Sequence, residues 1–438
     1  MRTNFLRTAR MGVALGGGLA GSLSANEALD LLEGKITAEE ATVDDILAAS
    51  RAEEVGVGEA AEKEVLRDNR DYSSRWKNRL APTALVYDNP NGRVVQAVAI
   101  DGLAEWGMAQ GSLEPKAGKS EDLDESQLKR VRLGGMMRAF YNTDLEGRVV
   151  ADGEGYQGVD TLKATVQVNE ALQVEGGKFR PPFSQEYKQD PAVRIAPRLS
   201  PLVEQVAPAN TLGTRVSVVD GPWELGLGWF SGARDRNLPD FEGGGFVLAN
   251  MSYTFDRDKV VAAGEEEGEA PPGHQRWHLD YLYNTSSERD GSVPLGYRHL
   301  LSTGIEVSSG DFDFAGDFIL ANGDIATAWG MTLTGRYWLF EDALRFVGRY
   351  SYADTDDDGA LSIGIGVADA RGDATQPLEG YSKVLAADEL HSFYAGLDWH
   401  FIQDYLILST GLEYQLLKNE SDGDFNNLLW HTGGRVAF

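Results

Sequence analysis

Arginine is the residue type in this chain whose placement points most clearly to chemistry. From residue 92 onward, Arg recurs in segments of alternating apolar and polar residues, on the face opposite the apolar side chains. A guanidinium group donates hydrogen bonds in a planar fork that suits oxyanions, whereas Lys presents a point charge. We therefore expect a polar surface that could contact small anions. The cations predicted on this face are Arg130, Arg132, Arg138, Arg148, Lys163, Arg215, Arg276, Arg298, Arg336, Arg345, Arg349 and Arg435.

The elements that must position these residues are strands. About sixteen segments have a two-residue period and end in Gly, Asp, Asn or Pro, beginning with 93–105 and 128–141. Hydrocarbon tolerates backbone only as helices or closed barrels, so lipid-facing apolar residues alternate with residues that face a wet lumen. No segment approaches the roughly 18 apolar residues of a membrane-spanning helix. The pattern predicts an all-β fold, a transmembrane antiparallel β-barrel.

The last strand, 428–438, has the clearest alternation. One face carries Leu428, Trp430, Val436 and Phe438, and the other carries Leu429, His431, Gly433 and Arg435. A terminal Phe on such a strand is typical of bacterial outer-membrane barrels. A soluble β-sandwich that happens to end in Phe is the competing interpretation, and the repetition of the pattern along the chain argues against it.

A barrel also offers a plainer interpretation of the Arg residues. Any barrel places its charged residues inside, because a charge on the lipid face near the midplane costs roughly 2–4 kcal/mol. The same alternation places acidic residues on the inner face, namely Asp280, Glu306, Asp398 and Glu413. The Arg residues could therefore be ordinary lumen lining.

The first 91 residues differ in composition from the rest. Residues 1–25 combine Arg residues, a short weakly apolar stretch and small residues before a cleavage point, which predicts an export signal. Residues 26–75 predict a helical, coiled-coil-like periplasmic segment that could trimerise, and the alternative is a solvated acidic leader. Residues 76–91 predict a linker, and residues 92–438 predict the barrel.

Composition excludes several classes of function. The chain has 438 residues and no Cys, so it contains neither a disulfide framework nor a thiolate metal site. The formal net charge of -28 argues against nucleic acid as a partner. The total charge does not exclude anionic solutes, because selectivity depends on the local field at the narrowest point of a pore.

Connections between the predicted strands alternate between short turns and longer segments, as expected for periplasmic turns and outer loops. The predicted outer loops include 106–127 and 181–211, while the acidic segment 256–274 breaks the rule because it should be a short turn. Loop 181–211 is Pro-rich and carries Arg194 and Arg198. Because a wide lumen must be narrowed by something, we expect this loop to fold inward; lying outside on the surface is the alternative.

Other chemistry has little support. Residues 354–359 resemble the first half of a calcium loop, but its twelfth position is Ile365 instead of Glu, so we interpret this segment as an acidic outer loop. The six His residues lack metal-ligand spacing, and no segment has the signature of a catalytic triad. We predict no catalytic residue, no metal and no cofactor.

Three segments carry a resemblance to a known family. These are Arg130-Val-Arg-Leu-Gly134, Gly177-Lys-Phe-Arg-Pro-Pro-Phe183 with Glu186, and Gly213-Thr-Arg-Val-Ser217 after the long loop. Together they resemble the phosphate-selective porin O and P family over roughly residues 92–438. The resemblance implies a sixteen-stranded trimeric channel with an inward third loop, an Arg ladder and Lys residues at the constriction. Arg130, Arg132 and Lys178 match its motif positions.

The sequence thus predicts a bacterial outer-membrane porin, not an enzyme, for passive diffusion of small anions such as phosphate. Its expected partners are outer-membrane lipid, small anionic solutes and two further copies of itself, with no nucleic acid. Two alternatives stay open. One is a general or sugar-type porin without anion selectivity, and the other is a structural protein that tethers the outer membrane through residues 26–75.

Overall fold

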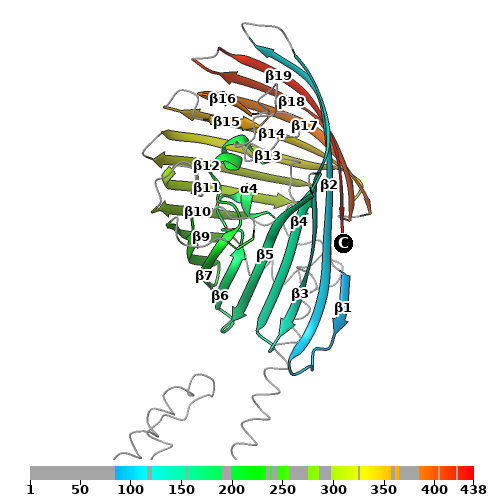
Figure 1. Cartoon of the computed structure of the whole chain (residues 1–438), viewed down its shortest axis with the longest axis vertical. Helices are drawn as coiled ribbons and strands as arrows, with labels where there is room; N and C mark the ends of the chain where they lie inside the picture. The colour runs from blue at the N-terminus through cyan, green and yellow to red at the C-terminus, as the bar shows by residue number, and fades with distance from the viewer. Residues whose placement is uncertain are drawn as a thin grey trace, which may run out of the picture. The chain divides into compact units, whose positions relative to one another are not determined.

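The structure is a computed structural model, shown in Figure 1. It describes residues 84–115, 121–153, 155–189, 199–232, 237–238, 244–255, 275–285, 297–323, 326–356, 361–364, 384–402, 405–420 and 423–438. The predicted export signal, the helix 26–75, the segment 256–274 and the loop residues Arg194 and Arg198 lie outside these ranges. No helix among the described residues is long and apolar enough to cross a membrane.

Within the described residues, a sheet of 17 antiparallel strands dominates the fold. The strands of this sheet are β1 (Ala84–Asp88), β2 (Val95–Pro115), β3 (Glu121–Ala139), β4 (Thr143–Asp152), β5 (Gly155–Gln167), β6 (Leu172–Phe179), β7 (Thr211–Asp220), β8 (Trp223–Ser231), β9 (Gly245–Phe255), β10 (Gln275–Asn284), β11 (Tyr297–Ser309), β12 (Phe312–Gly323), β13 (Thr327–Phe340), β14 (Leu344–Thr355), β17 (Glu389–Ile402), β18 (Leu406–Lys418) and β19 (Phe425–Ala437). A separate hairpin joins β15 (Leu361–Gly364) to β16 (Val384–Ala387).

The sheet closes on itself because the last strand pairs with the second. β19 runs antiparallel to β2 from Phe425↔Pro115 to Ala437↔Leu103, and β9 pairs directly with β10. All strands of the sheet except β1 therefore form a closed antiparallel barrel of 16 strands, as the alternation predicted. Between β9 and β10 the described sheet has no further strand.

The strand β1 is a difference from the sequence prediction, which treated residues 76–91 as a linker. β1 pairs with β2 from Ala84↔Ile100 to Asp88↔Ala97. Further along the same edge of β2, Phe438 exchanges two backbone hydrogen bonds with Gly102, at 2.8 and 3.0 Å. β1 and the C-terminal strand therefore share one edge of β2 end to end.

The first hairpin also differs from its prediction. The predicted outer loop 106–127 is largely strand, because β2 continues to Pro115 and β3 starts at Glu121. The β2–β3 register shifts between Glu105 and Trp106, which leaves Lys129 as an extra residue in β3. Such a bulge moves every later side chain to the other face. It interrupts the two-residue period that defined the predicted strand.

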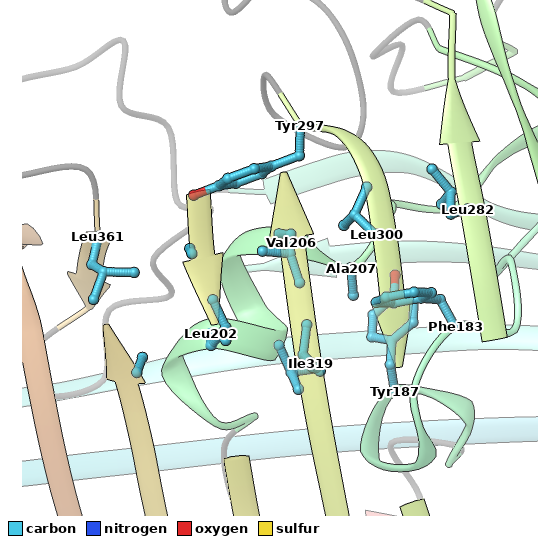
Figure 2. Packing of buried hydrophobic residues seen from close by; sticks show 14 of the residues in the cluster. Phe183, Tyr187, Leu202, Val206, Ala207, Leu282, Tyr297, Leu300, Ile319 and Leu361 are labelled. Carbon is cyan, nitrogen blue, oxygen red and sulfur yellow. The ribbon is translucent and has the colours of Figure 1, made fainter. Parts of the chain in front are cut away.

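Loop 180–210 folds into the lumen where it is described, as predicted, although it contains two short helices. These are α4 (Gln185–Lys188) and α5 (Pro201–Val206), and every residue of α5 is buried. Figure 2 shows loop residues packed against inward side chains of β10–β12 and the β15–β16 hairpin. The residues labelled there are Phe183, Tyr187, Leu202, Val206, Ala207, Leu282, Tyr297, Leu300, Ile319 and Leu361.

Candidate functional site

The lumen wall is the candidate site, and the strand register gives its composition. In β10, for example, His278, Asp280 and Leu282 are buried on the inner face, whereas Tyr281 and Tyr283 are about 40% exposed on the outer face. The same alternation places most of the predicted cations inward, where they pair across strands with other inward residues. Those whose register faces the lumen are Arg130, Arg132, Arg138, Arg148, Lys163, Arg215, Arg276, Arg336, Arg345, Arg349 and Arg435.

One half of the wall carries a chain of alternating charges. Lys163 lies 3.4 Å from Glu146 and 3.2 Å from Glu175. Arg215 lies 3.0 Å from the other oxygen of Glu175 and 3.6 Å from Glu224. The chain extends at both ends, because Arg148 contacts Glu146 and Asp101, and Arg276 lies 2.9 Å from Glu224. Residues of β2, of β4 to β8 and of β10 thus share one continuous run of ion pairs.

Several of the remaining wall cations also have acidic partners. Arg138 makes a two-pronged contact with Asp144, with both N–O distances at 2.7 Å. Arg345 lies 3.1 Å from Asp398 and stacks its guanidinium over Trp338 at 5.1 Å. Further pairs are Arg130–Glu105 at 3.7 Å, Arg336–Asp313 at 3.2 Å and Arg349–Glu413 at 3.8 Å. The inner wall is therefore largely a surface of paired charges, not a ladder of bare guanidinium groups.

Two predicted residues are placed differently from expectation. Lys178 lies opposite Leu162 and Leu212 in register, in the outward-facing row, and its ammonium donates to the Asn237 carbonyl at 2.8 Å. Alternation from the exposed Val174 already puts Lys178 in this row, so the expectation of a constriction position came from the family resemblance and not from the strand period. Arg298 is exposed at an irregularity near the start of β11. These positions do not bring Lys178 or Arg298 to a constriction.

Loop 180–210, called the third loop below, contributes charges of both signs to the lumen where it is described. Its Glu186 lies 3.4 Å from Arg349 of β14, and both of its oxygens accept a hydrogen bond from the Ser200 amide. Its Lys188 donates to Asp280 of β10 at 2.7 Å. Between α4 and β12–β13 lies a small pocket whose lining includes the polar residues Gln185, Asp317 and Thr332.

Sequence reasoning placed Asp280, Glu306, Asp398 and Glu413 inward, which their registers confirm. It did not single out Glu146, Glu175 and Glu224 as inward acidic residues, although the same alternation places them there. Among the described residues, no group of three or more His, Asp or Glu side chains is arranged to hold a metal ion.

Comparison with known proteins gives fold likeness without sequence likeness. No protein-family model and no curated protein matches the chain. The structure is similar to OprB of Pseudomonas putida, with a TM-score of 0.53, 10% identity, and 77% of this chain and 94% of that chain covered. It is also similar to OmpF of Salmonella typhi in a complex with daunomycin, with a TM-score of 0.50, 13% identity, and coverage of 81% and 100%.

The barrel has the porin fold. At 10% and 13% identity, these likenesses establish the architecture of the barrel and not its solute or its selectivity. The outer face supports a membrane setting independently, because large apolar side chains such as Leu162, Trp229 and Trp430 are each at least 50% exposed there. An apolar exterior around a closed barrel with a polar interior is the distribution expected of an outer-membrane barrel.

Proposed function

We propose that this protein is a porin of the bacterial outer membrane that lets small hydrophilic solutes diffuse passively through its lumen. The observation that carries the proposal is the closed barrel with an apolar outer face and an inner face of charged and polar residues. The third loop narrows that lumen by packing on one side of the wall. No step of bond making or breaking is part of this function.

Two versions of this function differ in selectivity. The excess of Arg over Lys on the wall supports small anions, phosphate included, as preferred solutes. The pairing of these cations with carboxylates favours a general porin, because a guanidinium that already contacts a carboxylate attracts a passing anion less strongly. We propose that small anions pass with only a weak preference over cations, and that the described part of the lumen wall does not act as a phosphate-specific filter.

Planar bilayers test both parts of the proposal. The folded protein should give stepwise conductance, and a potassium chloride gradient should give a reversal potential close to zero. Liposomes that contain the protein should swell in isotonic solutions of small neutral solutes. A folded barrel that conducts no ions would instead support a structural role, and a strongly anion-selective reversal potential would restore the Arg-ladder interpretation.

The outer face supports a homotrimer as the assembly state. Most of its circumference carries exposed aromatic residues, as expected where side chains meet the membrane interface. In the face made by β3 to β7, strand β5 carries the exposed aromatic residue Tyr156 at its start, and the other four strands carry exposed aliphatic residues instead. Those residues are Leu133, Leu145, Val149, Val174, Val216 and Val218. We propose that this aromatic-poor face is covered by neighbouring copies, with the number of copies taken from the resemblance to the phosphate-selective porins.

Two outward glycines provide a matched test of this face. A Cβ built on Gly147 of β4 would meet no described atom within 4 Å, and one on Gly335 of β13 would meet a Phe312 ring atom at 3.9 Å. We expect Gly147→Trp to release monomers while Gly335→Trp keeps the parent mass, because only the first ring would enter the interface. Light scattering in mild detergent measures both masses, and equal masses for the two variants would exclude β4 from the interface.

A further inference from the structure

The third loop is joined to the barrel wall by direct hydrogen bonds from its backbone to two wall carboxylates. The amide of Ser184 donates to Asp280 Oδ2 at 3.0 Å, and the amide of Gln185 donates to Asp317 Oδ2 at 2.8 Å. The two carboxylates stand on β10 and β12, and their residues are 0% and 5% exposed. Helices leave their first amides without intrahelical partners, and here the wall supplies the acceptors.

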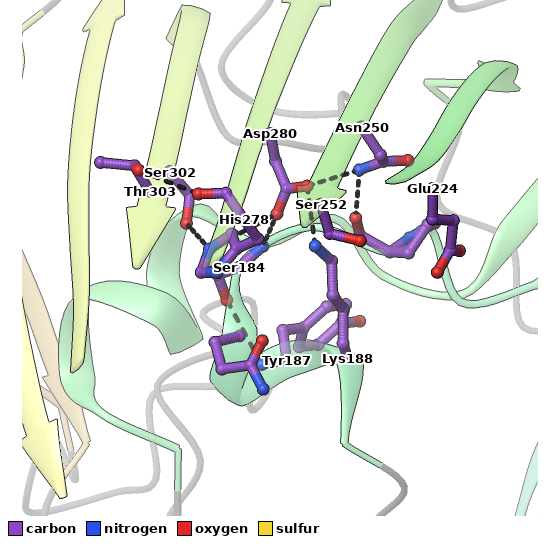
Figure 3. A network of polar contacts seen from close by, with 12 residues as sticks. Ser184, Tyr187, Lys188, Glu224, Asn250, Ser252, His278, Asp280, Ser302 and Thr303 are labelled. Carbon is purple, nitrogen blue, oxygen red and sulfur yellow. Dashed lines mark hydrogen bonds and ion pairs between the residues drawn. The ribbon is translucent and has the colours of Figure 1, made fainter. Parts of the chain in front are cut away.

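The surrounding side chains hold both carboxylates in place, as Figure 3 shows around Asp280. Asp280 Oδ1 accepts from Asn250 at 2.8 Å and from Lys188 Nζ at 2.7 Å. Asp317 Oδ1 accepts from the Ser302 hydroxyl at 2.6 Å. His278 lies beside both, with its Nε2 3.3 Å from Asp317 and 3.8 Å from Asp280. Each carboxylate is thus fixed by the wall and is directed at the loop.

The loop backbone is strained at the point of attachment. Ser184 has φ 60° and ψ 155°, a conformation that residues other than Gly rarely adopt. Its hydroxyl accepts a hydrogen bond from the Tyr187 amide at 3.3 Å. Strain of this kind persists only where surrounding contacts impose it. Contacts from Asp280 and Tyr187 therefore hold a loop conformation that the free chain would leave.

We propose that Asp280 and Asp317 are the positioning residues of the constriction, and that Asp280 also cancels the charge of Lys188. Together they hold the start of α4 against the wall, so the lumen keeps a fixed narrow width. Because the Lys188 ammonium contacts Asp280, the described part of the loop adds no net positive charge at this point. The effect on conduction rests on the proposed porin function, whereas the attachment of the loop does not.

Proteolysis tests the attachment without relying on conduction. Trypsin should cut folded Asp280→Asn/Asp317→Asn protein after Lys188 roughly tenfold faster than the parent, because losing charge-assisted hydrogen bonds raises the displaced population by about that factor. Asp398→Asn is the matched control, since Asp398 is equally buried on the wall at 3% exposure and contacts Arg345 and Ser409 instead of the loop. Equal cleavage rates in parent, control and double variant would overturn the proposal.

A covalent replacement keeps the test valid if the double variant does not fold. The chain has no Cys, so Gln185→Cys/Asp317→Cys introduces a single possible disulfide at the contact. The double-cysteine protein is first folded with its disulfide formed, and the disulfide is then reduced in the folded protein. With the disulfide formed, we expect the resistance to trypsin of the parent and quiet single-channel currents. With the disulfide reduced, we expect fast cleavage by trypsin and larger, noisier currents. If reduction changes neither the cleavage rate nor the single-channel current, the proposal is contradicted.

Reversal potentials test the charge assignment separately. Asp280→Asn should shift the reversal potential in the direction of anion selectivity. The double variant Asp280→Asn/Lys188→Gln should return the reversal potential to the parent value, while the cleavage rate of the loop or the noise of the current stays above that of the parent. If Asp280→Asn leaves the potential unchanged in a conducting channel, Asp280 does not cancel Lys188. If no variant conducts but cleavage still follows the carboxylates, the porin function fails and the loop attachment stands.

Discussion

Replacing Gly177 by Ala should abolish or strongly reduce the yield of folded barrel. Gly177 has φ 126°, and a Cβ built on it would lie 2.1 Å from the Leu162 carbonyl oxygen and 3.0 Å from the Lys163 Cα. Left-handed or mirror-image backbone costs a residue with a Cβ roughly 1–2 kcal/mol even without a collision. Here the colliding atoms belong to the backbone of the neighbouring strand, so the β5–β6 pairing itself must separate.

The adjacent glycine provides the control. A Cβ on Gly176 would meet only a Thr214 methyl group at 3.9 Å among the described atoms, which is ordinary contact. We therefore expect Gly176→Ala to fold with the parent yield. The heat-dependent gel shift of detergent-extracted protein and its urea midpoint measure the folded fraction. Equal behaviour of the two variants would mean that the backbone at Gly177 can relax, contrary to this argument.

The barrel could be predicted from the sequence because the bilayer imposes a simple rule on each strand. In β10, the outward Trp277 and Tyr281 and the inward His278 and Asp280 follow from alternation alone. The rule needs no knowledge of neighbours, since lipid on one side and water on the other act on every residue separately. This is why each of the predicted barrel strands corresponds to an observed one.

The misplaced boundaries arise where that rule does not apply. Strands β2 and β3 extend past the predicted ends through residues such as Gln110 and Asp124, which pair at the outer end of the hairpin. There both faces carry polar residues, so polarity does not mark the strand. The bulge at Lys129 interrupts the period within β3. β1 is five residues long, and all of its residues are exposed, so it leaves no burial pattern to detect.

The lumen was predictable in composition but not in its pairing. Alternation places Lys163, Glu175 and Arg215 on the inner face, yet their contacts depend on the β5–β6 and β6–β7 registers. A register is set by turns and bulges distributed over the sheet, which single-strand patterns do not reveal. Lys178 shows a different limit, because the strand period puts it in the outward-facing row whereas the family resemblance implied a place at the constriction.

These pairings lead to the second large expected effect, on selectivity. Glu175 is 7% exposed and lies between Lys163 and Arg215, at 3.2 and 3.0 Å. Glu175→Gln removes the charge that the two cations share, and each keeps only a more distant carboxylate, at 3.4 Å in Glu146 and 3.6 Å in Glu224. The wall there gains net positive charge, so we expect the anion-to-cation permeability ratio to rise.

The size of the change follows from the dielectric of the lumen. One unit charge acting on an ion 4 Å away contributes about 1 kcal/mol at the dielectric of bulk water and about 4 kcal/mol at an effective dielectric of 20. Even the smaller figure corresponds to roughly a fivefold change in local anion concentration. The reversal potential under a salt gradient should therefore move measurably, and less at 1 M salt, where the screening length falls to about 3 Å.

The matched control is Glu170→Gln, which removes the same charge from an exposed turn between β5 and β6. Its reversal potential should equal that of the parent, because an exposed charge outside the lumen is screened by water and salt. If the wall cations were free instead of paired, the parent would already be strongly anion-selective and Glu175→Gln would add little. Equal potentials for parent, Glu170→Gln and Glu175→Gln would therefore contradict the paired-charge lumen and return the choice of ion to the third loop.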